Sequence, residues 1–126
     1  MTIQEVLDAV DQLVPNAFSF EEKVAWLSTL DGMIKAEIID THEGAEKVSF
    51  EGYDVRIQHI EDSVLLAPEP YAHDLYVKYL QSQMDYFNGE SKRYNNSLAA
   101  FEAAYTAFAR WYNKTHLPIS KKRKYW

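Results

Sequence analysis

Apolar side chains recur at every third or fourth position near the start of the chain, which is the spacing of one face of an α-helix. Thr2 and Glu5 have the spacing of a capping box, in which each side chain accepts a hydrogen bond from the backbone N–H of the other residue. Pro15 ends the run, so the pattern predicts a first helix over about residues 3–14. Its apolar face consists of Ile3, Val6, Leu7, Val10, Leu13 and Val14.

A second and broader apolar stripe begins after Ser19, which forms another capping-box pair with Glu22. The stripe predicts a long central helix over about residues 20–41 that contacts more than one neighbour. Gly32 lies inside this helix, where glycine costs about 1 kcal/mol relative to alanine. A close crossing of another helix at Gly32 would explain this glycine.

Residues 43–70 lack a helical period. The segment KVSFEGYDVRI has two short alternating runs joined by Glu51 and Gly52, a pattern typical of a small β-hairpin. Because a hairpin of two strands is only marginally stable by itself in water, it would have to pack on the helices or on a partner. We predict a small β-hairpin or an irregular loop between two pairs of helices.

The helical period returns at Tyr71 and predicts two more helices. Asn88 and Gly89 separate them, because this pair suits a left-handed C-terminal cap. The last helix begins somewhere within 91–97 and ends before Pro118. Its large side chains are spaced 4, 3, 4, 3 and 4 residues apart, which is typical of a seam packed against another helix. These side chains are Tyr94, Leu98, Phe101, Tyr105, Phe108 and Tyr112.

The aromatic residues of 85–116 allow three interpretations: a ligand-binding surface, a stacking surface for nucleic acid, or the seam of a helical hairpin. The regular spacing favours the seam, and six alanines between positions 99 and 109 would let a partner helix approach closely. The sequence thus predicts an all-α fold of two helical hairpins, about four helices in all, within a single domain over residues 1–116.

Charge is distributed unevenly along the chain. All 19 acidic residues lie within 1–102 together with seven basic residues, whereas 103–126 contain six basic residues and no acidic residue. We predict that residues 117–126 form a flexible basic tail. Basic side chains suit phosphate or acidic partners, and aromatic rings suit nucleobases or protein pockets. The candidate partner-binding residues of the tail are Lys121, Lys122, Arg123, Lys124, Tyr125 and Trp126.

Few residues suggest catalysis or metal binding. The chain has no cysteine, which excludes disulfides, thiolate metal sites and cysteine nucleophiles. No two of its four histidines have an i, i+4 spacing and no Glu-x-x-His occurs, so the di-iron bundle motif is absent. We interpret His59 and its acidic neighbours in HIED as polar surface residues. We therefore predict no enzyme, no metal and no cofactor, and the lack of an apolar run of bilayer length predicts no membrane segment.

Residues 68–118 contain a set of adjacent aromatic and polar residues. They are Tyr71, Tyr79-Leu80, Asp85-Tyr86, Asn88-Gly89-Glu90, Arg93-Tyr94-Asn95 and Trp111-Tyr112-Asn113. In these motifs the segment, about two fifths of the chain, resembles small proteins of the head–tail connector family, also called adaptor or head-completion proteins, of tailed bacteriophages and prophages.

The resemblance implies a structural protein of the virion, without catalytic residues. Subunits of this family are mostly helical and assemble as a ring beneath the portal, where they join the DNA-filled head to the tail. The implied partners are the portal protein, tail or stopper proteins and other copies of the chain, all assembled in the host bacterial cytoplasm. DNA passes through such a ring during packaging without sequence-specific binding.

The resemblance also implies roles for two segments. Residues 117–126 would form an arm that reaches the portal. The loop around Val48–Ile57 would face the channel or the next component, and its central residues are Phe50, Glu51, Gly52 and Tyr53.

Two alternatives stay open. A small cytosolic helical protein could use the basic tail to contact nucleic acid or to regulate a partner. An enzyme could have a pocket between the hairpins, lined by Tyr76, Tyr79 and Trp111. The resemblance of residues 68–118 favours the connector, and an acidic body also fits a channel through which DNA must slide.

Overall fold

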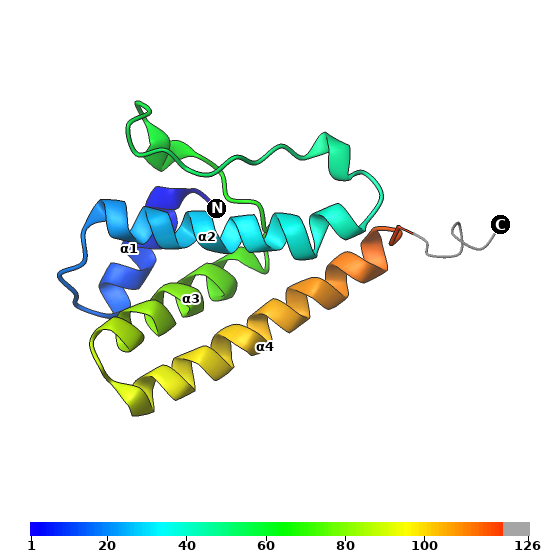
Figure 1. Cartoon of the computed structure of the whole chain (residues 1–126). Coiled ribbons are helices and arrows are strands. Elements are labelled where there is room, and N and C mark those ends of the chain that lie inside the picture. Colours follow the sequence, from blue (N-terminus) through cyan, green and yellow to red (C-terminus); the bar gives the residue numbers. More distant parts are fainter. Residues whose placement is uncertain (120–126) are drawn as a thin grey trace.

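The computed structural model describes residues 1–119, and the four helices in this part of the chain confirm the all-α prediction (Figure 1). They are α1 (Ile3–Leu13), α2 (Phe20–Glu37), α3 (Ala72–Phe87) and α4 (Ser91–Thr115). Three short 3₁₀ turns lie between α2 and α3: η1 (Ile39–Thr41), η2 (Ala45–Lys47) and η3 (Ile60–Asp62). The described residues form no β-strand, only two isolated bridges. None of the described helices is long and apolar enough to cross a membrane.

Both predicted capping boxes are present and explain where the first two helices begin. Thr2 Oγ1 accepts a hydrogen bond from the Glu5 N–H at 3.2 Å, and Glu5 Oε1 accepts one from the Thr2 N–H at 2.9 Å. Ser19 and Glu22 make the same pair of hydrogen bonds at the start of α2. The predicted starts of α1 and α2 are therefore confirmed, because both depend on partners three residues apart.

α2 ends at Glu37, earlier than predicted, because nearby side chains occupy its last carbonyls. The Thr41 hydroxyl donates to the carbonyls of Glu37, at 3.2 Å, and Ile38, at 2.8 Å. His42 Nδ1 also lies 2.5 Å from the Ile38 carbonyl. These side chains satisfy carbonyls that a further helical turn would have used, so the chain continues as the η1 turn.

The turn between α3 and α4 has the predicted left-handed cap. Gly89 has φ +71°, and its N–H donates to the Tyr86 carbonyl at 3.1 Å. The Glu90 N–H donates to the Asp85 carbonyl at 3.0 Å, so carbonyls at the end of α3 are satisfied. α4 begins directly after this turn, at Ser91.

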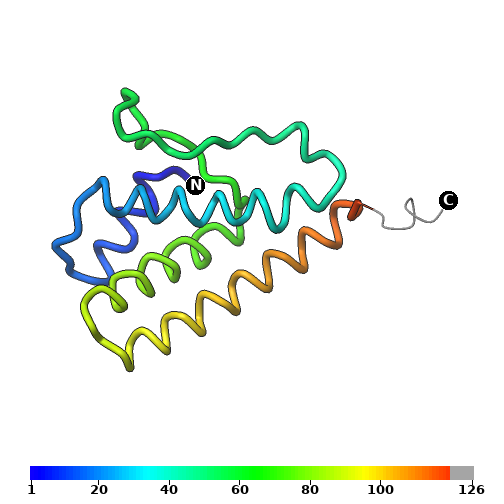
Figure 2. The backbone as a smooth tube through the Cα atoms, in the orientation of Figure 1, coloured from blue at the N-terminus to red at the C-terminus, as the bar shows by residue number. Residues whose placement is uncertain are grey.

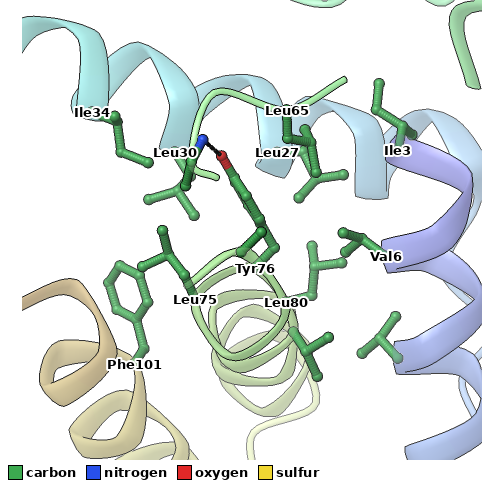
Figure 3. Close-up of a cluster of buried hydrophobic side chains, with 14 of the residues drawn as sticks. Ile3, Val6, Leu27, Leu30, Ile34, Leu65, Leu75, Tyr76, Leu80 and Phe101 are labelled. Carbon is green, nitrogen blue, oxygen red and sulfur yellow. Dashed lines mark hydrogen bonds between the residues drawn. The ribbon is translucent and has the colours of Figure 1, made fainter. Parts of the chain in front are cut away.

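α3 lies at the centre of the helical assembly. α1 and α4 pack on opposite sides of α3, and α2 crosses over it (Figure 3). α4 has the most extensive contact with α3, so these two helices form one of the predicted hairpins. α1 and α2 contact each other less than each of them contacts α3, so the first pair is held together mainly through α3. Fully buried residues of the shared core include Ile3, Val6, Leu27, Leu30, Leu75 and Leu80.

The large side chains of α4 form the seam of the hairpin, as their spacing predicts. Phe101, Phe108 and Tyr112 are buried, and Phe108 is only 1% exposed. The Phe101 ring lies 5.0 Å from the Tyr79 ring on α3, and the Phe108 ring lies 6.2 Å from the Tyr71 ring. The half-buried residues of the same seam are Tyr94, Leu98 and Tyr105.

The segment between α2 and α3 is an irregular loop, and the β-hairpin that the alternating runs suggested does not form. Figure 2 shows that the segment runs back along α2 before it enters α3. The rings of Phe50 and Tyr53 meet edge to face at 4.9 Å, and the Tyr53 N–H donates to Ser28 Oγ on α2 at 3.0 Å. The loop thus makes contacts to α2 in place of those that a second strand would provide.

No helix crosses closely at Gly32, so that expectation is wrong. A Cβ atom added to Gly32 would meet only the Phe50 ring, at 4.0 Å. This distance is ordinary van der Waals contact, and Phe50 belongs to the loop rather than to a helix. Close packing therefore does not require glycine at this position.

Replacing Phe108 or Phe101 by alanine should lower the free energy of unfolding by about 3–5 kcal/mol, because each change removes a buried ring and leaves a cavity in the seam. Glu102→Ala is a matched control on the same helix; its side chain is exposed, and the change should stay within about 0.5 kcal/mol. Urea unfolding measures these differences. If Phe108→Ala lowers the free energy of unfolding no more than the control does, Phe108 is not packed in a seam between α3 and α4.

Candidate interaction surfaces

The four loop residues predicted from the sequence lie against α2. Glu51 and Gly52 are exposed, whereas Phe50 and Tyr53 are half-buried because their rings contact α2. Gly52 has φ +101°, and a Cβ atom added there would lie 3.2 Å from Ser28 Oγ. Both the backbone conformation and the available space therefore favour glycine. Glu51 and Gly52 are thus the exposed part of the loop, while its two rings hold it on α2.

The Asp31 carboxylate ties this loop to two helices. Asp31 lies within α2 and is fully buried. Its Oδ1 accepts a hydrogen bond from the Tyr76 hydroxyl on α3 at 2.5 Å, and its Oδ2 accepts bonds from the Tyr53 hydroxyl and from the Leu66 N–H at 3.1 Å. The Tyr76 hydroxyl in turn accepts a hydrogen bond from the Ala67 N–H at 2.8 Å (Figure 3). One carboxylate thus joins α2, α3 and two distant parts of the loop.

Burial has the largest influence on Asp31 and raises the pKa of its carboxyl above the usual value. The hydrogen bonds from Tyr53, Tyr76 and the Leu66 N–H act in the opposite direction, because they favour the carboxylate. Burial and the neighbouring carboxylate raise the pKa of both tyrosines, so their hydroxyls keep their protons and remain donors. The buried carboxylate therefore has a complete set of structural partners.

The chain that follows α4 is hydrogen-bonded to the segment that follows α2. The Glu43 N–H donates to the Leu117 carbonyl at 2.7 Å, and the Ile119 N–H donates to the Thr41 carbonyl at 2.9 Å. Residues 117–119, which the sequence assigns to the tail, are therefore joined to the helical body. The predicted partner-binding residues of the tail lie outside the described part of the chain; they are Lys121, Lys122, Arg123, Lys124, Tyr125 and Trp126.

A buried histidine lies at this junction. The Nε2 atom of His42 lies 2.6 Å from the side-chain amide of Asn113 on α4. The His42 ring packs edge to face against the Tyr112 ring. Tyr112 in turn stacks on His116, with the two ring centroids 3.9 Å apart. No pattern in the sequence indicates this contact, because Asn113 lies 71 residues further along the chain. The contact links the end of α2 to the end of α4.

An open cavity of about 840 Å³ lies beside the junction. Its walls come from residues 42–48, from the end of α4 and from Ile119. Glu43, Glu46 and Lys47 supply charged groups to this wall.

One exposed cluster has the ligand types of a metal site. Potential ligand atoms of His59, Glu61 and Asp62 lie within 4.8 Å of one another on the η3 turn. One nitrogen and two carboxylates could ligate a divalent cation. The cluster is on the surface, where acidic groups commonly occur without a metal, and its arrangement agrees equally with the predicted polar surface.

The three residues considered for an enzyme pocket are used in packing. Tyr76 is fully buried, and its hydroxyl is bonded to Asp31. Tyr79 packs against Phe101, and the Trp111 ring lies 5.4 Å from the Tyr71 ring. The three side chains that suggested an enzyme pocket between the hairpins therefore pack against other side chains of the protein.

The sequence did contain a signal for Asp31, which the pattern analysis missed. Asp31 falls on the apolar stripe of α2, four residues after Leu27 and three before Ile34. A carboxylate at such a position is buried and requires donors. Only the folded chain shows that Tyr53 and Tyr76 supply them, because they lie 22 and 45 residues away.

Comparison with known proteins gives no match for this chain to a family model, to a curated protein or to a solved structure. A proposal for its function therefore depends on the motifs in its sequence and on the geometry of its own residues.

Tyr53→Phe should cost about 1.5–3 kcal/mol of folding free energy while Asp31 is ionised, because it removes a hydrogen bond to a charged group. The cost should shrink as the pH falls through the raised pKa of Asp31, since protonated Asp31 loses less when this donor is removed. The sign follows from the raised pKa: ionisation of Asp31 lowers the stability of the fold as the pH rises from the ordinary carboxyl pKa through the pKa that Asp31 has in the folded protein.

Urea unfolding across this pH range makes the comparison. Tyr86→Phe is the matched control, because its ring is 60% exposed and its hydroxyl has no hydrogen bond in the described structure. A Tyr53→Phe penalty that does not depend on pH would contradict the proposed role of Asp31.

The purified protein should contain no stoichiometric transition metal, because the η3 cluster offers three solvent-facing ligands and no cysteine occurs in the chain. Elemental analysis after dialysis tests this expectation. About one zinc per chain, lost in His59→Ala, would show that the cluster is a metal site.

Proposed function

We propose that the protein is a structural subunit of the head–tail connector of a tailed bacteriophage or prophage. The subunit would assemble as a ring under the portal and join the DNA-filled head to the tail. The observation that carries this proposal is the resemblance of residues 68–118 to that family. This segment coincides with one structural unit, the α3–α4 hairpin and the residues that flank it. A shared unit of this kind supports a shared architecture.

The positions of two contact regions support the proposal. The loop with the exposed Glu51 and Gly52 lies over α2, whereas residues 117–119 follow the end of α4 (Figure 1). A subunit placed between two components needs surfaces for both of them. In this proposal, the loop faces the channel or the next component, and residues 117–126 reach the portal.

The charge of the body also supports the proposal. Residues 1–90 contain 18 acidic and five basic residues. A surface with this excess of negative charge repels the DNA phosphates, so DNA can pass without adhering to it. The same property is unsuited to a protein that binds DNA through its helical body.

A second candidate is a small cytosolic helical protein that contacts nucleic acid or regulates a partner. The observation in its favour is that residues 91–126 contain eight basic residues and one acidic residue. Basic and aromatic side chains in one segment can neutralise phosphates and stack on nucleobases. The two candidates assign different partners to residues 120–126: the portal protein in the first, and nucleic acid or a regulated partner in the second.

Deleting residues 120–126 tests the arm. The truncated chain is designed to end at Ile119, so that the hydrogen bond from the Ile119 N–H to the Thr41 carbonyl is kept. We expect a melting temperature close to that of the full chain and loss of capture by assembled portal from the same genome. Trp126→Ala should weaken portal capture more than Lys122→Ala, because buried aromatic residues dominate protein interfaces.

The same variants are tested on duplex DNA over a salt series. If the second candidate is right, the lysines matter more than Trp126, and affinity falls by roughly one log–log slope unit per neutralised phosphate. Undiminished portal capture by the truncated chain would remove the role of the arm. DNA binding by the full chain without any portal capture would favour the second candidate.

A further inference from the structure

One face of α4 is not covered by any part of the described structure. The opposite face forms the seam on α3, so the exposed face points away from the body. The exposed positions recur at intervals of three or four residues along the whole helix, so they form one continuous strip. The α4 strip consists of Lys92, Asn96, Ala99, Ala103, Ala107, Arg110 and Lys114.

The α4 strip has basic side chains at both ends and small apolar side chains in the middle. Lys92, Arg110 and Lys114 form no ion pair within residues 1–119. The strip contains no acidic residue, and the single acidic residue of α4, Glu102, lies beside it rather than on it. Three alanines occupy the centre, where their small side chains allow another helix to approach closely. The strip thus has the chemistry to receive a helix with an acidic face.

α1 has such a face. Glu5, Asp8 and Asp11 are exposed on α1, and the η3 turn packed beside this helix adds Glu61 and Asp62. Within residues 1–119, Lys23 is the only basic side chain that forms an ion pair with α1, and its Nζ lies 2.8 Å from an Asp11 carboxylate oxygen. α1 and α4 lie on opposite sides of α3 (Figure 3). One flank of the molecule is therefore acidic and the opposite flank is basic.

We propose that the α4 strip of one chain docks on the acidic α1 face of a second copy. The two faces are different and lie on opposite flanks, so each copy keeps one free face of each kind for the next copy. Such a head-to-tail contact produces a closed ring if the rotation between copies closes, and an open filament if it does not. The ring rests on the proposed connector function, whereas the contact between two copies can be tested by itself.

The lengths of the two helices agree with this contact. The 11 residues of α1 span about 16 Å, and the alanine part of the strip, from Ala99 to Ala107, spans about 12 Å. α1 can therefore lie over the alanines while its acidic side chains reach toward the basic ends of the strip. Opposite charges across a contact steer association and fix its register. The contact should weaken with salt, because the charges are on the surface.

The test measures self-association of the full chain by sedimentation at increasing protein concentration and low salt. The double variant Arg110→Glu/Lys114→Glu places negative charge against the acidic α1 face, so its dissociation constant for self-association should rise about tenfold or more. The control Lys47→Glu/Arg56→Glu changes the net charge equally but lies on the loop, and it should associate like the unmodified chain.

A second variant, Asp8→Lys/Gln12→Lys, places two lysines on the α1 face and changes the charge of residues 5–12 by +3, leaving equal numbers of acidic and basic side chains there. It leaves the capping box and the Asp11–Lys23 pair unchanged. It should also associate weakly by itself. Mixing it with Arg110→Glu/Lys114→Glu should restore association, because the new lysines on α1 of one variant are complementary to the new glutamates on α4 of the other. Restoration in the mixture is not expected from variants that merely fail to fold.

Several results would overturn the proposal. These are an unmodified chain that stays monomeric at low salt and high concentration, an α4 variant that associates like the control, and a mixture that fails to recover. The outcome is separate from that of portal capture. A portal that captures the α4 variant as a full ring would leave the connector function standing and remove this contact. Charge-dependent association of the chain without portal capture would support the contact between copies and count against the connector function.

Discussion

The buried Asp31 carboxylate is the interaction on which the arrangement of the long loop depends. It accepts hydrogen bonds from Tyr76 on α3 and from Tyr53 and Leu66, at two separate points of the loop. A loop of this length would otherwise be expected to move freely over the surface. With these bonds in place, Gly52 is held against Ser28, and the exposed part of the loop has a defined position. A loop that presents a fixed surface suits a structural subunit.

The parts of the fold that depend on near neighbours could be predicted from the sequence. The capping boxes and the left-handed Gly89 need partners within a few residues, and the α4 seam follows from the spacing of its side chains. The partners of Asp31 and His42 could not be predicted, because they are brought together only when the helices pack. The alternating pattern around Glu51 was misleading: Phe50 and Tyr53 are half-buried against α2, whereas Val55 and Ile57 of the second run are exposed and pair with no strand in the described chain.

The separation of charge connects the fold to both proposals. The acidic residues are concentrated before α4, and the basic residues are concentrated in and after it. Because α1 and α4 lie on opposite sides of α3, the separation along the sequence becomes a separation in space. In these proposals, the acidic body discourages DNA from adhering, and the basic α4 strip contacts the acidic flank of another copy. The packing of both helices on α3 therefore determines which surfaces are left for partners.

A connector ring beneath a portal should be visible by electron microscopy of assembled portal from the same genome, mixed with the purified full chain. We expect a ring of copies coaxial with the portal, extending its channel, with neighbouring copies in contact through α4 and α1. Portal particles that show no added ring when the chain is in excess would rule out the proposed connector function.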